Sequence, residues 1–447
     1  MKAKQLKPLI LLPLLFFVLA LTGCTQETPE ATSEDIRLQW WGVFLSEDVV
    51  QPLIEEYQNA NAGVEILYRD KWPGGESSVA TKLYQEELER VLKNNDPTGG
   101  GDESLAVPDI FMVQNTWAGK YEAYTRSAPS TVLTADTVKT AYYAAVAEDF
   151  AQGDVVRGLP LWMDSLAVIY NKKILATAAA SVPPTNWADF KNLALTLTKK
   201  SSNVITQAGF AAGTSTNVSF APELLNLLLL QNGVNMLDGS GNPIFSIDSD
   251  SVTALDFYQS FAKGTGTWND DLKNDSLAFL EGDVAMIVAP SWRLYDILKF
   301  NDIYDLGLEI GVAPIPQLSG QVSTYNWATY WGAMVALNRP NGDAAWKFVN
   351  WLSQPEQLRK LRANQTTENE FSGILYPRID MQGDLASDTW MKVYNASLPS
   401  AQSWYMVDGV AVRDVMMQLI DSSGGNSAVA SAENSIQIII SSKGLLD

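Results

Sequence analysis

The chain has 447 residues, and its 51 Asp and Glu against 31 Lys and Arg give a formal charge of -20. This length predicts two domains, and the acidic charge disfavours nucleic acid and anionic lipid headgroups as partners. The sequence has no His and a single Cys, which removes the commonest metal ligand and the usual general base of hydrolases and excludes an intrachain disulfide.

The N-terminal segment has the pattern of an export signal. Three Lys residues among the first seven precede an apolar run from Leu9 to Leu21. The run is too short, and too promptly followed by polar residues, for a stable membrane span. It ends in Leu21-Thr22-Gly23-Cys24, which resembles a bacterial lipobox, where the peptide is cut before the Cys and the Cys sulfur is lipidated. We predict a lipoprotein signal peptide over residues 1–23 and lipidation of Cys24; the alternative is an ordinary signal peptide with a chance Cys.

The segment after this Cys is predicted to be a flexible tether over residues 24–35. Its sequence from residue 25, TQETPEATSED, contains no large apolar side chain and cannot build a core. The folded part is therefore expected outside the cytoplasm. It would be anchored at the outer face of the cell membrane, or lie in the periplasm of a Gram-negative host.

Strands and helices alternate over the first part of the folded chain. The apolar spacing predicts a strand at Ile36–Trp41, a helix at Ser46–Tyr57, a strand at Val64–Tyr68, a helix at Lys82–Leu92 and a strand at Val107–Val113. Asn94–Glu103 is a loop by composition. This alternation predicts a parallel sheet with crossover helices, and ligands bind beyond the carboxyl ends of such strands. Four residues lie at two of these ends: Trp41, Asn115, Thr116 and Trp117.

The same alternation restarts after Gly158. The predicted elements are a strand at Leu166–Tyr170, a helix at Trp187–Lys199, a short strand at Gln207–Ala212, helices at Pro222–Gln231, Ser251–Ala262 and Ser276–Glu281, and a strand at Val284–Val288. The helix with the sequence LLNLLLL is too short to span a bilayer and is predicted to be buried. Just before the first of these strands stand Trp162 and Asp164.

Several segments, taken in order, resemble the extracellular solute-binding proteins of bacterial ABC importers, the family that includes the maltose-binding protein. The segments are Pro108-Asp109-Ile110; RGLPLWMDSLAVIYNKKIL followed by PPTNWADF; SLAFLEGDVAMIVAPSW; and GVAPIP, then TYWGAMVAL and AAWKFVNWLSQPEQ. They span nearly the whole mature chain. Two departures are a loop at Gly99–Gly101 that looks inserted and a loose match over Ala401–Asp414.

The resemblance implies a two-lobed α/β fold of the type II periplasmic-binding-protein kind. Each lobe would be a mainly parallel sheet flanked by helices, with the ligand in the cleft between the lobes. The first lobe is expected over residues 36–157 plus 317–368, and the second over 158–316 plus 369–447. Binding would close the lobes around the ligand, and the closed form would dock on an ABC permease in the membrane.

A site for sugars needs flat aromatic surfaces and a few carboxylates or amides. In addition to the four strand-end residues, the candidate ligand-binding residues are Trp162, Asp164, Asn217, Trp292, Tyr330, Trp331, Trp404 and Tyr405. Trp41 could equally be core, because it neighbours Trp40 on a strand. Asp164 is preferred as a ligand contact over a structural ion pair, because a carboxylate beside an apolar strand needs partners. Asp109, after Pro108, is preferred as a turn or cap residue.

These observations predict a substrate-binding lipoprotein that captures a carbohydrate and delivers it to a permease. We expect a monomer that is not an enzyme, has no cofactor or metal, and binds no nucleic acid. One alternative is a lipid-anchored glycoside hydrolase, which would need two carboxylates facing each other, and no motif presents such a pair. Another is the same binder with a polyamine or other non-sugar cargo, because acids and aromatics can also hold a cation.

Overall fold

The computed structural model describes residues 36–72, 78–94, 106–320, 323–369 and 373–442, all within a unit that begins at Ile36. The predicted signal peptide, the tether and Cys24 lie outside the described residues. So does the predicted loop after Asn94, including Gly99–Gly101. Among the described residues, no helix combines the length and the hydropathy needed to cross a membrane.

A five-stranded mixed sheet forms one half of the folded part. Its strand order is β2-β1-β3-β11-β4, with β1 at Ile36–Gly42, β2 at Val64–Asp70, β3 at Ile110–Gln114, β4 at Gly158–Asp164 and β11 at Thr329–Val335. β1 pairs in parallel with β2 and β3, whereas β11 runs antiparallel to both β3 and β4. The carboxyl ends of β1, β2, β3 and β4 therefore lie at one edge, together with the amino end of β11.

A three-stranded sheet forms the other half, with β5 (Leu166–Asn171) between β8 (Met286–Pro290) and β9 (Ile310–Pro314). Both pairings are antiparallel, so the expectation of a mainly parallel second sheet is wrong. The reason is the direction of β5, which leads away from the five-stranded sheet while β8 and β9 run toward it. Two smaller pairs are β6 (Lys199–Ser201) with β7 (Val204–Gln207) and β10 (Asn326–Trp327) with β12 (Ala401–Gln402).

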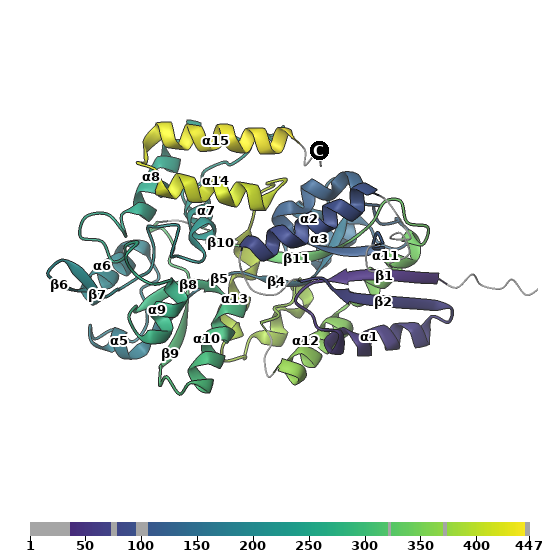
Figure 1. The fold of residues 1–447 in the computed structure, drawn as a ribbon, viewed down its shortest axis with the longest axis horizontal. Coiled ribbons are helices and arrows are strands. Elements are labelled where there is room, and N and C mark those ends of the chain that lie inside the picture. The colour runs from purple at the N-terminus through teal and green to yellow at the C-terminus, as the bar shows by residue number, and fades with distance from the viewer. Residues whose placement is uncertain (1–35, 73–77, 95–105, 321–322, 370–372, 443–447) are drawn as a thin grey trace, which may run out of the picture. The chain divides into compact units, whose positions relative to one another are not determined.

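Helices surround both sheets (Figure 1). The α-helices are α1 (Glu47–Ala60), α2 (Ser78–Asn94), α3 (Ala135–Ala141), α4 (Ala144–Phe150), α5 (Lys172–Ala176), α6 (Trp187–Leu197), α7 (Ala221–Gln231), α8 (Ser249–Gln259), α9 (Asp275–Glu281), α10 (Ser291–Ile303), α11 (Gly342–Leu352), α12 (Pro355–Asn369), α13 (Met391–Ser397), α14 (Gly409–Asp421) and α15 (Gly425–Ser441). The 3-10 helices are η3 (Asn115–Tyr124), η4 (Phe245–Ile247), η5 (Ile379–Leu385) and η6 (Leu398–Ser400).

The apolar pattern explains which surfaces these elements bury. In α1 the buried residues Val49, Leu53 and Tyr57 repeat every four positions, so one face packs against β2 and α12. Every residue of β5 is buried, as expected for a central strand. The second sheet is covered by α9, α10 and α13, which contact its strands.

Two local predictions differ from the structure. Gln207–Ala212 is not a strand: β7 ends at Gln207, and Ala208 forms only an isolated bridge with Val284. Residues 158–164, expected to open the second lobe, form β4 of the five-stranded sheet instead. Pro160 and a register shift opposite Trp331/Gly332 interrupt the regular alternation of this strand, which hides it from the apolar pattern.

The two sheets are joined at a very short crossover. β4 ends at Asp164 and β5 begins at Leu166, so Ser165 alone separates a strand of one sheet from a strand of the other. The carboxyl ends of β8 and β9 pair with the first residues of β5, Leu166 and Ala167. The edge of the five-stranded sheet that carries its strand ends and the corresponding edge of the second sheet therefore meet at this crossover.

Candidate functional site

Aromatic side chains gather at the strand ends of the five-stranded sheet. Phe44 follows β1, Trp72 follows β2, and Trp331 stands near the amino end of β11. Their ring centroids are 4.2 Å apart for Phe44 and Trp72, 5.3 Å for Phe44 and Trp331, and 6.0 Å for Trp72 and Trp331. We call these three residues the strand-end aromatic cluster. Sheet edges of this kind are where ligands bind in open α/β sheets.

Exposure within the strand-end aromatic cluster is graded. Phe44 is 41% exposed, Trp72 is partly buried, and Trp331 is 8% exposed. Phe44 also has a φ of 61°, a left-handed conformation that costs free energy in a bulky residue. Phe44 presents its aromatic ring to solvent at the edge of the sheet, and strained backbone conformations of this kind cluster at ligand and active sites.

Two buried rings, those of Trp117 and Tyr84, pack against Trp331 of the strand-end aromatic cluster. Trp117 lies 4.8 Å and Tyr84 6.1 Å from Trp331, measured between ring centroids. The Nε1–H of Trp117 donates to Oε1 of Gln114 at 2.7 Å, and the hydroxyl of Tyr84 donates to the carbonyl of Met112 at 2.7 Å. These bonds fix the position of the supporting rings and, through them, that of Trp331.

Asn115 and Tyr330 belong to a buried network around Asp149. The Nδ2 of Asn115 donates to Oδ2 of Asp149 at 3.1 Å, and the backbone N–H of Tyr330 donates to Oδ1 of Asn115 at 3.2 Å. The hydroxyls of Tyr330 and Ser403 also donate to Asp149. Burial raises the pKa of Asp149 to about 6. The network ties η3, α4, β11 and the segment before Trp404 together.

Trp162 and Asp164 end β4 at the same sheet edge. Trp162 is partly buried and stands opposite Trp331 across the strand pair. Asp164 is 4% exposed and accepts hydrogen bonds from the backbone N–H of Ser165 at 2.7 Å, the N–H of Ser291 at 3.0 Å and the Ser291 hydroxyl at 2.7 Å. Burial raises the pKa of Asp164 to about 7. Ligand contact by this carboxyl stays a prediction.

Trp292 provides the aromatic surface of the second half. It follows Ser291 at the start of α10 and is partly buried. Its ring lies 5.6 Å from that of Phe220, and the guanidinium of Arg293 lies 4.7 Å from its centroid. It thus stands where α10 leaves the end of β8, beside Asp164.

The two C-terminal candidates bridge to other elements. The Nε1–H of Trp404 donates to Oδ1 of Asn226 at 2.8 Å, and Trp404 is nearly buried. The hydroxyl of Tyr405 donates to Glu122 at 3.4 Å, and burial raises the pKa of Tyr405 to about 12. These bonds hold the Trp404–Tyr405 segment between α7 and η3.

The remaining candidates are separate from the strand-end aromatic cluster. Trp41 is fully buried, with the ammonium of Lys71 at 4.2 Å from its ring centroid. Thr116 is partly buried, and its hydroxyl donates to Gln114 at 3.4 Å. Asn217 accepts from Nε1–H of Trp268 at 2.9 Å and donates to two backbone carbonyls, so its amide has protein partners. Their roles at a ligand site stay predictions.

Sequence reasoning did not identify Phe44 and Trp72. Each stands two residues beyond the last residue of an observed strand, Gly42 and Asp70 respectively. The rule that ligands bind beyond carboxyl strand ends could have found both. Among the described residues, no group of His, Cys, Asp and Glu is suited to hold a metal ion.

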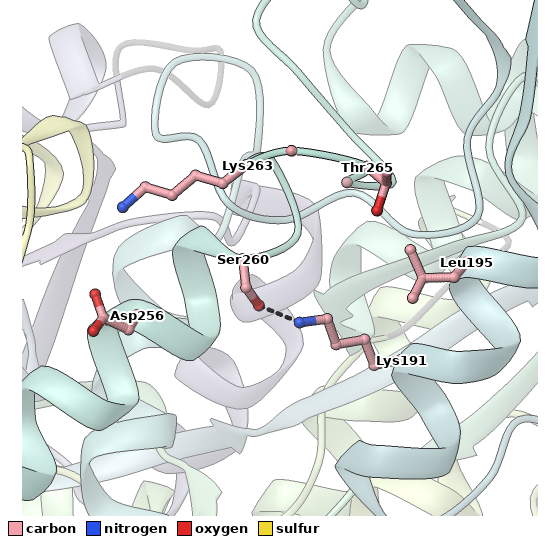
Figure 2. A pocket seen from close by; sticks show the side chains of 8 residues that line it. Lys191, Leu195, Asp256, Ser260, Lys263 and Thr265 are labelled. Carbon is pink, nitrogen blue, oxygen red and sulfur yellow. Dashed lines mark hydrogen bonds between the residues drawn. The ribbon is translucent and has the colours of Figure 1, made fainter. Parts of the chain in front are cut away.

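A separate pocket of about 510 Å³ lies between α6, α8 and the loop that follows α8 (Figure 2). Its Lys191 donates to the Ser260 hydroxyl at 2.5 Å and lies 5.5 Å and 5.4 Å from the ring centroids of Phe257 and Phe261. None of the residues predicted to bind ligand lines this pocket.

Two sheets that meet at a single-residue crossover, with aromatic side chains at their edges, define a two-lobed α/β fold of the binding-protein kind. The chain belongs to the family of bacterial extracellular solute-binding proteins, and the sequence model of this family matches residues 46–358.

Curated relatives are similar over most of the chain. A maltotriose-binding protein from Pyrococcus abyssi is 25% identical over 320 residues, which are 70% of this chain and 61% of that protein. The chain therefore spans about three fifths of this relative's length. A putative ABC transporter periplasmic-binding protein, YcjN, from Escherichia coli is 22% identical over 78% of this chain and 75% of that protein.

Solved structures share the fold. A cyclic alpha-maltosyl-1,6-maltose binding protein from Arthrobacter globiformis aligns with a TM-score of 0.69 at 16% identity, covering 91% of this chain and 99% of that one. The sugar-binding protein MalE from Xanthomonas citri aligns with the same score at 17% identity, covering 91% and 97%. At these identities the likeness establishes the two-lobed fold alone.

Proposed function

We propose that this protein is the substrate-binding component of an ABC importer, and that it captures a carbohydrate between its two sheets and delivers it to a membrane permease. The observation that carries the proposal is the strand-end aromatic cluster, in which the exposed Phe44 and the partly buried Trp72 pack on the buried Trp331 at the edge where such folds bind ligands. Flat aromatic surfaces suit the apolar C–H faces of sugar rings. The sugar-related names of several relatives support the same class of ligand.

The proposed contacts come from both halves of the fold. Phe44, Trp72 and Trp331 would stack on the sugar from the five-stranded sheet, and Trp162 and Trp292 would complete the site at the crossover. The other residues predicted from the sequence remain part of this proposal, Asp164 through its hydrogen bonds to Ser291 and not by direct contact. The lobe boundaries given above are adjusted for β4. Rotation of the halves about the crossover at Ser165 would close the site.

The ligand is tested by calorimetry and thermal shift. Maltotriose, mannobiose and glucose are titrated alongside spermidine, because a ligand that binds only the native state raises the melting temperature. A rise with a sugar and none with spermidine is the expected result. A response to spermidine alone would replace the carbohydrate with a cationic cargo. Release of reducing sugar from maltotriose would instead favour the hydrolase alternative.

The site is tested with a matched pair of variants. Phe44→Ala removes a ring of the strand-end aromatic cluster, whereas Phe300→Ala removes a ring of similar exposure, 43%, on α10. Loss of a stacking contact worth about 1.4 kcal/mol weakens sugar binding about tenfold. We expect this loss for Phe44→Ala and unchanged affinity for Phe300→Ala. Equal affinities in both variants would place the sugar elsewhere.

The proposal also includes export, anchoring of a monomer through lipidated Cys24, and cleavage after Gly23. Detergent phase partitioning of the protein expressed in a bacterial host tests the anchor. The wild type is expected in the detergent phase and Cys24→Ser in the aqueous phase. Recovery of both in the aqueous phase would contradict lipidation.

A further inference from the structure

The side chain of Asp164 forms hydrogen bonds that link the two halves of the fold, in addition to the covalent crossover at Ser165. It is the last residue of β4, and its carboxyl accepts hydrogen bonds from both the backbone N–H and the hydroxyl of Ser291. Ser291 is the first residue of α10, which follows β8 of the other sheet. A side-chain bond from one sheet to the helix of the other therefore lies next to the crossover at Ser165.

The Ser291 hydroxyl has one hydrogen and two acceptors. Oδ2 of Asp164 is 2.7 Å away and the carbonyl oxygen of Gly373 is 2.8 Å away. If the carboxyl of Asp164 carries a proton, it donates to the Ser291 oxygen, and Ser291 donates to Gly373, so that every group is satisfied. If the carboxyl is ionised, Ser291 can donate to only one of the two acceptors, and one bond is lost.

This arrangement is flanked by two proposed sugar contacts. Trp162 precedes Asp164 by two residues on β4, and Trp292 follows Ser291 directly. Gly373, which accepts from Ser291, also lies close to the backbone of Trp292: a Cβ built on Gly373 would lie 3.0 Å from Cα of Trp292. We call the hydrogen-bonded set of Asp164, Ser291 and Gly373 the Asp164–Ser291–Gly373 relay. The relative position of the two Trp residues thus depends on the Asp164–Ser291–Gly373 relay.

We propose that Asp164 is a positioning residue, which holds Trp162 and Trp292 in their sugar-binding arrangement through the Asp164–Ser291–Gly373 relay and does not itself contact the sugar. The proposal rests on the proposed function, because it presumes that these two Trp residues contact the ligand. It differs from the direct ligand contact predicted from the sequence. The burial of the carboxyl and its protein donors favour the positioning role.

The proposal implies that sugar affinity depends on pH. The relay is complete when Asp164 is protonated, and its carboxyl is desolvated with a pKa raised to about 7. Tyr394 of α13 is a titratable group that interacts with it electrostatically. On α10, the nearest charged side chain along the helix, Arg293, pairs with Asp296. Affinity should therefore fall as pH rises through 7.

The test uses maltotriose titrations at pH 5.5 to 8.5 with two variants. Asp164→Asn places an uncharged N–H donor against the Ser291 hydroxyl, and its remaining oxygen, in the place of Oδ1, still accepts the Ser291 N–H, which lies 3.2 Å from Oδ1 in the wild type. The variant therefore mimics the protonated relay and is expected to bind at every pH as the wild type does at low pH. Wild-type affinity is expected to fall about fivefold across the range, as one hydrogen bond is lost. Ser291→Ala breaks the relay and is expected to bind weakly without a pH dependence.

The direct-contact alternative predicts different outcomes. If Asp164 accepted a sugar hydroxyl, Asp164→Asn would weaken binding at every pH, and Ser291→Ala would leave the pH profile unchanged; either result overturns the proposal. A pH-independent wild-type affinity also overturns it. Asp302→Asn, at an exposed carboxyl on α10, is the control and should match the wild type.

The relay can also be tested in the free protein by melting temperature. This measurement distinguishes a failure of the relay from a failure of the proposed function. In the free protein, the melting temperature of the wild type minus that of Asp164→Asn should decrease from pH 5 to pH 8, because only the wild-type carboxyl ionises. A difference that is constant with pH overturns the relay. Absence of maltotriose binding by the wild type, with this difference intact, would count against maltotriose as the ligand and leave the relay standing.

Discussion

The buried carboxyl of Asp149 predicts a specific pH dependence of folding stability. Its pKa is raised from 3.8 to about 6 in the folded state by burial. The protonated form is therefore favoured by the fold, so the stabilisation is complete below pH 4 and is lost as pH rises through 6. A pKa raised by about 2 corresponds to ~3 kcal/mol of folding stability, and ~2 kcal/mol of this stability is lost between pH 4.5 and pH 7.5.

The assay compares the wild type with Asp149→Asn. The amide resembles the protonated acid in shape and does not ionise. The variant should therefore lack the pH-dependent contribution of Asp149 to the free energy of unfolding. Urea denaturation at intervals from pH 4.5 to 7.5 gives the free energy of unfolding of both proteins. We expect the wild type to lose ~2 kcal/mol relative to the variant over this range. Contributions from other carboxyls, including Asp164, are common to both proteins and cancel in the difference.

A relative stability that stays flat over this range would refute the reasoning. It would mean that the donors from Tyr330, Asn115 and Ser403 outweigh the desolvation of the carboxylate and hold it ionised throughout. A relative stability that rises with pH would reverse the sign altogether.

Three further predictions follow from single contacts. Arg339→Met leaves Asp109, which is fully buried and accepts from Arg339 Nε at 2.8 Å, without its charge partner, and should cost about 3–5 kcal/mol in urea denaturation. Lys82→Ala removes the 3.1 Å pair with Asp414 between α2 and α14, and should cost less than about 1 kcal/mol because both side chains are half exposed, with a smaller effect at high salt. Gly209→Ala would place its Cβ 1.8 Å from a backbone carbonyl oxygen of α6, so the melting temperature should fall by several degrees at least; an unchanged value would mean that this contact relaxes freely.

The sequence predicted those elements whose apolar pattern is regular. The buried run of β5 and the apolar helix α7 were located to within a residue or two. β4 was not predicted as a strand, because Pro160 and the register shift interrupt its alternation. The antiparallel second sheet was also not predicted, since the direction of β5 is set by the crossover and no local pattern records it.

The site was predicted in part for a similar reason. Trp117 and Trp331 were candidates because they stand at strand ends or in family-like segments, and the structure brings them within 4.8 Å. Phe44 was not a candidate, because the strand-end candidates stopped at Trp41, the last residue of the predicted strand. The left-handed backbone conformation of Phe44 is not visible in the sequence either. The sequence also could not indicate that the amide of Asn217 has Trp268 as a buried partner.

The distribution of the indole rings has an optical consequence. Of the 14 Trp residues, the partly buried ones are Trp72, Trp162, Trp292, Trp351 and Trp390. The first three lie at the sheet edges around the crossover. An aqueous quencher such as acrylamide should therefore reach the emission of these edge residues before that of the core, and a bound molecule should shield them. With the ligand at the proposed site, the change in quenching on binding would report occupancy without any attached dye.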